Sequence, residues 1–204
     1  MIAIMYVSTA KWRLGVKVSR EQMKANRERI LTEAGRLFRE KGFDSVGVAE
    51  VMNAAGLTHG GFYGHFASKD DLIAQTVAHM FKPADDQANG LEDIAGFVDA
   101  YLSPRHRAGV ARGCPTAALV ADIRRQGPET RSALTAGVRC QIDRIAAEML
   151  NASPLEVRRN ATGVWATMVG AVIMARTIND EALSDQILSD ARDWIKSRTS
   201  NHEA

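Results

Sequence analysis

The sequence predicts an all-α protein built from two helical parts, and three observations support this fold class. Apolar residues recur at spacings of three and four along most of the chain, as they do on one face of a helix. No stretch shows the strict alternation of a half-buried strand, and Gly or Pro separates the periodic stretches. The chain has 204 residues, 46% of them hydrophobic and 25% charged, which is typical of globular proteins and excludes wholesale disorder.

The chain divides into three segments. Residues 1–18 show no sustained period and form an N-terminal extension, for which a disordered arm and residues upstream of the true start both stay open. Residues 19–82 form a first domain and residues 83–204 a second. The boundary is expected in the stretch P-A-D-D-Q-A-N-G at residues 83–90, which is rich in turn-forming residues.

The first domain begins with a long helix. Ser19, followed by Glu21 and Gln22, marks its start, and Gly42 marks its end after Lys41. One face of this helix is apolar at helical spacing. Its members are Ile30, Leu31, Ala34, Leu37 and Phe38.

Two short helices and a tight turn follow. The first has Val48, Val51, Met52 and Ala55 on one face, and Gly56 closes it. Thr58 is expected to cap the second, which covers about residues 59–66, although Gly47 leaves the first with a weak cap. Ser68 then starts a fourth helix, with Asp70 and Asp71 in its first turn. This arrangement is a helix-turn-helix, whose second helix is expected in the major groove of DNA.

One stretch carries a family resemblance. G-F-x-x-V-x-V-x-x-V-x-x-A-A-G-L-T-x-G-x-F-Y-x-H-F-x-S-K-D-x-L resembles the DNA-binding domain of TetR-family (TetR/AcrR-type) transcriptional regulators, from about Asn26 to Met80. The resemblance implies a homodimeric repressor that leaves a palindromic DNA operator when a small-molecule effector binds. Lys69 matches the lysine that contacts the DNA backbone. The resemblance also implies DNA-facing roles for Thr58, His59, Gly60, Gly61, Tyr63 and His65.

Positive charge gathers where DNA binding is expected. Residues 11–41 hold ten Lys or Arg against four Asp or Glu, a net charge of +6, whereas residues 81–204 carry −1. Arg20, Lys24 and Arg27 are candidate phosphate or minor-groove contacts, with ordinary surface charge as the alternative for each. Phe62 and Phe66 are predicted core residues. The two adjacent glycines, at 60 and 61, either let DNA approach closely or pack tightly against the first helix.

The second domain is predicted to contain helices alone. After a short irregular stretch, a helix is expected from Pro115 to Gln126. Two long helices follow, over about 128–150 and 154–178, and a last one over 181–196. The first helical face of the domain comprises Leu91, Ile94, Phe97, Val98 and Tyr101. The last helix is predicted to bury Leu183, Ile187, Ala191 and Trp194.

The resemblance implies an effector pocket and a dimer seam in this domain. Candidate pocket residues are Phe97, Tyr101, Cys114, Met149, Trp165 and Met168, for which plain core packing is the alternative. Small residues and an apolar preceding helix suggest a four-helix seam. Its candidate residues are Leu134, Val138, Ile142, Ile145, Gly163, Gly170 and Ala171.

Cysteine and charge patterns limit other functions. Cys114 stands in G-C-P at a helix start, which favours thiolate and suggests a redox or electrophile sensor, with tight packing as the alternative. Cys114 and Cys140 are too far apart for a zinc site. No metal-spaced cluster, phosphate loop or paired nucleophile is present, so we expect no cofactor, no metal and no enzyme; an all-helical enzyme is the remaining alternative. The low-charge run at 161–175 is too short to span a bilayer, so we expect a soluble cytoplasmic protein without membrane contact.

Overall fold

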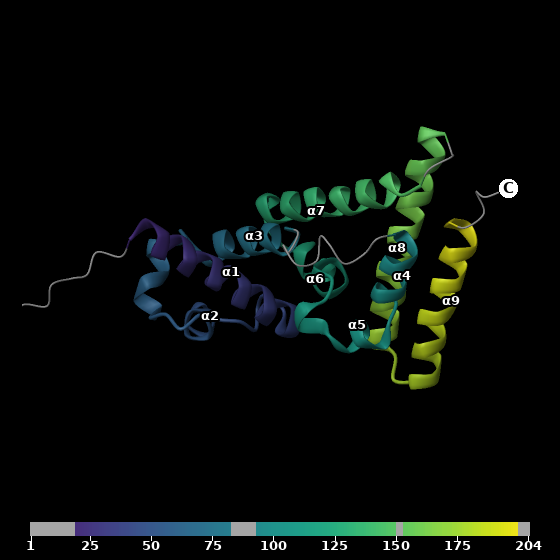
Figure 1. Cartoon of the computed structure of the whole chain (residues 1–204). Coiled ribbons are helices and arrows are strands. Elements are labelled where there is room, and N and C mark those ends of the chain that lie inside the picture. Colours follow the sequence, from purple (N-terminus) through teal and green to yellow (C-terminus); the bar gives the residue numbers. More distant parts are fainter. Residues whose placement is uncertain (1–18, 83–92, 150–152, 200–204) are drawn as a thin grey trace, which may run out of the picture.

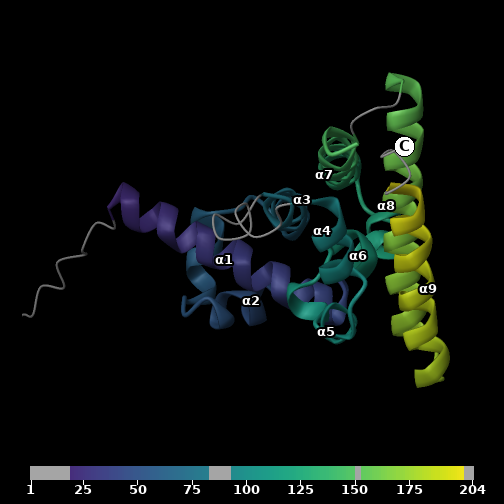
Figure 2. The same ribbon diagram turned by 45° about the vertical axis from the view of Figure 1, so that its right-hand side comes forward.

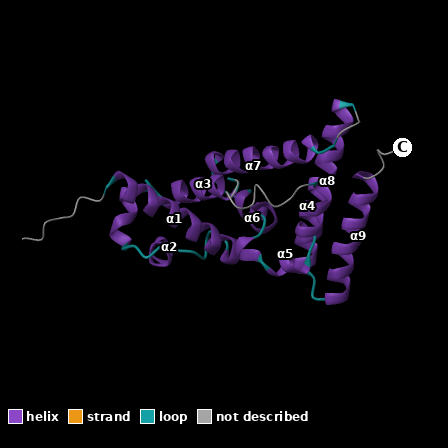
Figure 3. Ribbon diagram, in the orientation of Figure 1, coloured by secondary structure: helices purple, strands orange, loops and turns teal. Residues whose placement is uncertain are grey.

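The structure is a computed structural model that describes residues 19–82, 93–149 and 153–199. Every regular element within these ranges is helical (Figure 3), which confirms the predicted fold class. The N-terminal extension at 1–18, the expected domain boundary at 83–90, Leu91 and the expected helix end at Leu150 lie outside the described residues.

Four elements form the described residues 19–82, and local sequence sets their ends. Figure 1 labels three of them, α1, α2 and α3. Ser19 caps the first helix by accepting from the Gln22 amide, and Gly42 ends it with a φ of 79°. Ser68 caps the fourth by accepting from the Asp71 amide. The elements are α1 (Arg20–Lys41), α2 (Val48–Ala54), the 3₁₀ helix η1 (His59–Gly64) and α3 (Lys69–Met80).

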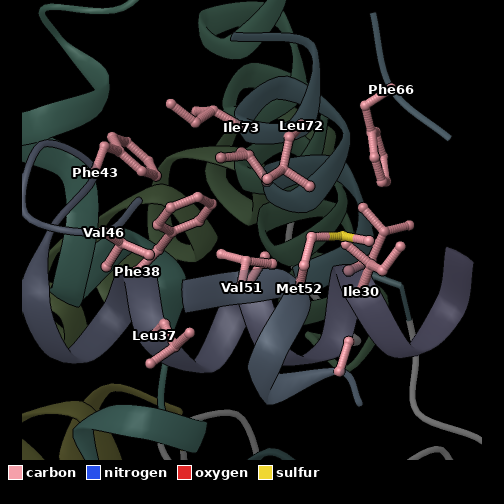
Figure 4. Close-up of a cluster of buried hydrophobic side chains, with 14 of the residues drawn as sticks. Ile30, Leu37, Phe38, Phe43, Val46, Val51, Met52, Phe66, Leu72 and Ile73 are labelled. Atoms are coloured by element: carbon pink, nitrogen blue, oxygen red, sulfur yellow. The ribbon is translucent and has the colours of Figure 1, made fainter. Parts of the chain in front are cut away.

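These elements enclose a first core (Figure 4), in which every residue of the apolar stripe predicted for α1 is buried. Phe38 packs edge-on against Phe43, with their ring centroids 5.1 Å apart. Gly56, with a φ of 69°, makes the turn after α2. The α2 residues Val51 and Met52 thereby reach the same core as the α1 stripe.

The second part is formed by six helices and one short 3₁₀ element within the described residues. In both views α8 and α9 lie side by side along one end of the molecule (Figures 1 and 2). A capping box formed by Ser153 and Glu156 starts α8. The elements are α4 (Ile94–Tyr101), α5 (Pro104–Ala108), η2 (Val110–Arg112), α6 (Pro115–Ile123), α7 (Pro128–Ala147), α8 (Pro154–Thr177) and α9 (Glu181–Thr199).

Helix α6 belongs to both cores. Leu119 and Ile123 are buried in the first core, whereas Cys114 at the start of the helix is buried in the second. The end of α1 is joined to the same region, because Arg39 Nε donates to the Ala111 carbonyl at 2.7 Å. Side-chain packing therefore crosses the predicted division between 19–82 and 83–204.

The prediction for the last helix was correct for two residues and wrong for the other two. Ile187 and Ala191 are partly buried against the second core. Leu183 and Trp194 are 44% and 43% exposed, whereas Ser184, Leu188 and Ile195 are the buried positions. Both sets have helical spacing, so periodicity alone did not distinguish them. Helix α9 consequently packs one face on α8 and presents a second apolar face outward.

The candidate dimer residues lie in two environments. Leu134 packs on the first core and Val138 on the second, while Ile145 and Ala171 are each only 2% exposed. Ile142 is partly buried against the second core. By contrast, a Cβ atom added at Gly163 or Gly170 would meet no other atom within 4 Å. The α7 candidates therefore pack within the chain, and the open surface lies on α8.

Candidate nucleic-acid interface

The predicted recognition helix is shorter and tighter than expected. The prediction of a helix over about 59–66 was wrong in extent, because the structure has a six-residue 3₁₀ element, His59–Gly64. Three of its six residues are glycine, and each costs an α-helix about 1 kcal/mol relative to alanine. The predicted Thr58 cap is also wrong, since its side chain makes no capping hydrogen bond. Gly47, as expected, offers no side-chain cap to α2.

The candidate DNA-facing residues of η1 are exposed to solvent. Thr58, His59, Gly60 and Gly61 are all exposed. Tyr63 is 73% exposed, which makes its ring available for an external contact. A Tyr side chain combines a large apolar face with a hydroxyl, so it suits sugar, thymine methyl or phosphate contacts.

Two aromatic anchors hold this exposed segment on the first core. Phe62 is 1% exposed and Phe66 is 2% exposed, which confirms their predicted core role. Their rings stack at a centroid distance of 5.7 Å, and the Tyr63 ring packs edge-on against Phe62 at 5.2 Å. Phe62 is therefore buried in the core, whereas the Tyr63 ring packs against it and stays largely exposed to solvent.

The two glycines are not explained by packing within the chain. A Cβ atom at Gly60 would meet nothing within 4 Å, and one at Gly61 would meet only Met52 and Thr58 at ordinary contact distances. Of the two alternatives left open by the sequence, tight packing against α1 is therefore not supported.

Arg27, a candidate phosphate contact, makes its hydrogen bonds within the protein. Its guanidinium donates to the carbonyl of His65 and to the side-chain oxygen of Gln75. The guanidinium carbon also lies 4.5 Å from the centre of the Phe66 ring, a cation–π contact. Arg27 of α1 thereby holds the end of η1 and joins it to α3.

Asp71 extends this network to the loop that precedes α3. One carboxylate oxygen accepts from Gln75 Nε2 at 2.6 Å, and the other accepts from the Ala67 amide at 2.9 Å. Both hydrogen bonds hold the pKa of Asp71 below its ordinary value, and the bond from Gln75 has the larger effect. Ser68 accepts from the Asp71 amide at 3.0 Å, so loop and helix start are fixed together.

The remaining candidate phosphate contacts border this network. Lys69 is the first residue of α3 and is half-buried, while Arg20 and Lys24 are exposed on the first turns of α1. His65 is partly buried, and burial together with the Arg27 charge lowers its pKa. Near pH 7 its imidazole is therefore neutral and can donate one hydrogen bond.

The six candidate pocket residues all belong to the second core. Tyr101 is central, because its ring centroid lies 5.9 Å from that of Phe97 and 5.7 Å from that of Trp165. Met168 is fully buried, Cys114 is 9% exposed and Met149 is partly buried against the same cluster.

Two residues that sequence reasoning missed organise this region. His106 Nδ1 donates to the Tyr101 carbonyl at 2.6 Å, which leaves Nε2 to accept from the Cys114 amide at 3.1 Å. Burial lowers the pKa of His106, consistent with a neutral ring. Arg176 of α8 donates to the carbonyls of His106 and Arg107. Neither residue lies in a motif, so only the fold identifies them.

Comparison with known proteins decides the family. Residues 30–76 match the family described as bacterial regulatory proteins, tetR family, and residues 90–190 match the tetracyclin repressor-like C-terminal domain. The chain belongs to the TetR family. TetR-family proteins are DNA-binding transcriptional regulators of the helix-turn-helix type, so this is a transcriptional regulator.

Relatives of this TetR-family chain fall into the same class. The HTH-type transcriptional regulator Rv0196 of Mycobacterium tuberculosis is 25% identical over 185 residues, covering 85% of this chain and 95% of that protein. The HTH-type transcriptional repressor KstR2 of the same organism is 29% identical over 94 residues, covering 42% and 47%. The crystal structure of E. coli NemR in its reduced form superposes with a TM-score of 0.69 at 22% identity, over 85% of this chain and 96% of that one.

The described residues contain no group of three or more His, Cys, Asp or Glu side chains arranged to hold a metal ion. None of their helices is both long enough and apolar enough to cross a membrane.

Proposed function

We propose that this TetR-family regulator is a homodimeric repressor that a small-molecule effector releases from a palindromic operator. The exposed face of η1 carries this proposal, because Tyr63 projects outward from a segment that Phe62 and Phe66 anchor in the core. Thr58, His59 and the glycines beside them would approach the bases, and Lys69, Arg20 and Lys24 would contact phosphates.

The dimer is proposed to form through α8 and α9. Helix-turn-helix dimers read two half-sites about one turn of DNA apart, so operator binding needs two copies. Leu183 and Trp194 of α9 are exposed, and Met174 of α8 is 51% exposed. A groove of about 550 Å³ runs between the two helices. A self-complementary face of this kind suits a two-fold interface. Its lining residues are Ala166, Thr167, Gly170, Ala171, Met174, Ile187, Asp190 and Ala191.

Effector control is proposed to pass through α6. Leu119 and Ile123 of this helix are buried in the first core, and Cys114 at its start is buried in the second core. A shift at its start would therefore displace groups that pack against α1. Coupling between two binding sites is commonly about 1–3 kcal/mol, enough to change operator affinity by roughly five- to 150-fold.

Footprinting of the DNA upstream of the protein's own gene tests this function. At about 150 mM salt, we expect a two-fold symmetric footprint that scrambled competitor does not remove. Tyr63→Ala should abolish the footprint while the protein remains a dimer. Trp194→Glu should shift the protein from dimer to monomer in sedimentation. Equal binding to specific and scrambled DNA would refute a sequence-specific repressor.

Oxidation of Cys114 is a second candidate for the release signal. The thiol lies at the first turn of α6 and interacts electrostatically with Arg39 and Arg176. Peroxide-dependent release that disappears in Cys114→Ser would support this route, whereas unchanged release in that variant would exclude it.

A further inference from the structure

Three buried polar side-chain atoms without a hydrogen-bond partner occur at the end of α4, the start of α6 and the last turn of α8. They are the hydroxyl of Tyr101, the hydroxyl of Thr116 and Nη1 of Arg176. Tyr101 and Thr116 are only 7% and 6% exposed. An unpaired buried polar group lowers stability, so such atoms indicate a role outside folding. His106 joins two of them, because its ring lies 4.4 Å from the Tyr101 ring and its carbonyl accepts from Arg176. The neighbour of the Tyr101 hydroxyl is the thiol of Cys114, a weak hydrogen-bonding group.

The same region carries positive charge without a nearby carboxylate. Arg176 interacts electrostatically with Tyr101 and Cys114, and none of the ion pairs formed among the described residues includes Arg176. Burial lowers the pKa of Arg176, which shows that its charge is poorly solvated. Arg176 is partly buried, and a partly buried cation is stabilised by an accompanying anion.

The start of α6 adds backbone donors to this positive region. Cys114 makes no side-chain cap, and Pro115 occupies the first helical position. The amides of the next two residues therefore lack intrahelical acceptors, and the helix dipole favours negative charge there. The helix has nine residues, long enough for such a field.

Arg176 is held in a fixed orientation that leaves one nitrogen available. Nε donates to the Arg107 carbonyl at 3.0 Å and Nη2 to the His106 carbonyl at 2.7 Å. Gly113 packs against it so closely that a Cβ there would lie 2.8 Å from Nη2. The guanidinium is thus preorganised, and only Nη1 remains for another acceptor.

We propose that this region anchors the effector and that the effector is a small organic carboxylate with an apolar body. Its carboxylate accepts hydrogen bonds from Arg176 Nη1 and the Tyr101 and Thr116 hydroxyls, while its apolar part contacts Trp165. A carboxylate fits because guanidinium, hydroxyl and helix-start amides are all donors to anionic oxygen. The proposal rests on effector control as proposed above and specifies its ligand class.

Binding at this place would also move the helix that couples the two cores. All three atoms are covered by protein, so a carboxylate reaches them only when the start of α6 shifts. Because Leu119 and Ile123 of the same helix pack in the first core, that shift is transmitted towards α1. Ligand affinity and operator affinity are then linked reciprocally.

Benzoate provides the probe, and benzamide is its uncharged control of nearly the same shape. We expect benzoate to raise the melting temperature of the wild-type protein and to weaken operator binding, with little effect from benzamide. Arg176→Lys, which keeps the charge but loses the planar fork, and Tyr101→Phe should each weaken benzoate binding about tenfold or more.

Tyr101→Phe and Thr116→Val supply a readout that a purely structural role would not give. Thr116→Val removes a buried hydroxyl without a hydrogen-bond partner, so this variant should melt higher than wild type without ligand, by roughly 2–4 °C. Tyr101→Phe removes a hydroxyl that has only the weak Cys114 thiol beside it, so this variant should melt no lower than wild type. A residue that only supports the fold would instead lower the melting temperature when truncated. A lower melting temperature in both variants would overturn the assignment of these hydroxyls to a ligand.

The outcomes separate this inference from the repressor function. Equal responses to benzoate and benzamide, with operator binding intact, would overturn the carboxylate site and leave the repressor standing. Benzoate affinity that is unchanged in both Tyr101→Phe and Arg176→Lys would overturn its location. A rise in melting temperature with benzoate that is lost in Tyr101→Phe, without release of the operator, would support the site and overturn its regulatory role.

Discussion

Replacing Arg27 with glutamine separates two ways in which a basic residue supports DNA binding. Arg27 touches the His65 carbonyl, the Gln75 side chain and the Phe66 ring, all within the protein. We therefore expect it to position the end of η1 and not to contact phosphate. Loss of Arg27 should weaken operator binding through misplacement of Tyr63 and His65.

The magnitude follows from the contacts that are lost. A partly buried cation–π contact contributes about 1 kcal/mol, and a hydrogen bond from a charged donor contributes about 1.5 kcal/mol. The ordering of η1 thus loses up to about 2.5 kcal/mol per protomer. Since each 1.4 kcal/mol is a factor of ten, we expect a loss of roughly 10- to 100-fold in affinity for each half-site that a protomer occupies.

The assay is operator binding as a function of salt, for Arg27→Gln, Arg27→Lys and Lys69→Gln. Removal of a phosphate contact reduces the slope of log K against log[salt] by about 0.9 for each contact, so Lys69→Gln should flatten it. Arg27→Gln should keep the wild-type slope while losing affinity. Arg27→Lys should behave similarly, because an ammonium cannot replace the planar fork.

Arg29→Gln is the matched control, because it removes one exposed charge of α1 that is not among the candidate phosphate contacts. The Ala67 amide donates a hydrogen bond to Asp71, so hydrogen exchange at this amide measures local opening directly. A shallower salt slope in Arg27→Gln, with unchanged exchange at Ala67, would refute the positioning role and restore the phosphate contact.

Three further perturbations have defined outcomes. Gly60→Ala should stabilise the fold by up to about 1 kcal/mol in urea unfolding, since a Cβ meets nothing there, yet weaken operator binding; unchanged affinity would contradict close DNA approach. Gly47→Ser should add about 1 kcal/mol of stability by capping α2 and leave effector-domain properties unaltered. Lowering the pH from about 7.5 to 5.5 should destabilise the protein, because the pKa values of His65, His79 and His106 are all depressed on folding. The unfolded chain then binds more protons below its ordinary histidine pKa of about 6.5, so stability is retained above that pH and lost below it; a flat urea midpoint would argue against buried neutral imidazoles.

The helical framework could be predicted because its determinants are local. Ser19, Gly42 and Ser68 set helix ends through contacts within one turn of themselves, and apolar spacing identified the buried stripe of α1. The site was less predictable. Arg27 reads as a surface cation, and only its contacts with α3 and the end of η1 show a positioning role. Arg176 lies in an apolar helix without a motif, and its partners are about 70 residues away.

Helix α9 shows why spacing cannot identify what a face packs against. Leu188 and Ile195 lie seven residues apart, on one face of the helix, and are buried in the second core. Leu183 and Trp194 also have helical spacing, but they are exposed. Burial of either apolar face gives a free-energy gain of about 25 cal/mol per Å², and the sequence does not specify which surface supplies the partner. A single chain has no need for the second stripe, whose exposed Trp194 would favour aggregation unless covered. Two apolar faces on one terminal helix are what a chain requires if one face completes its own core and the other meets a second copy.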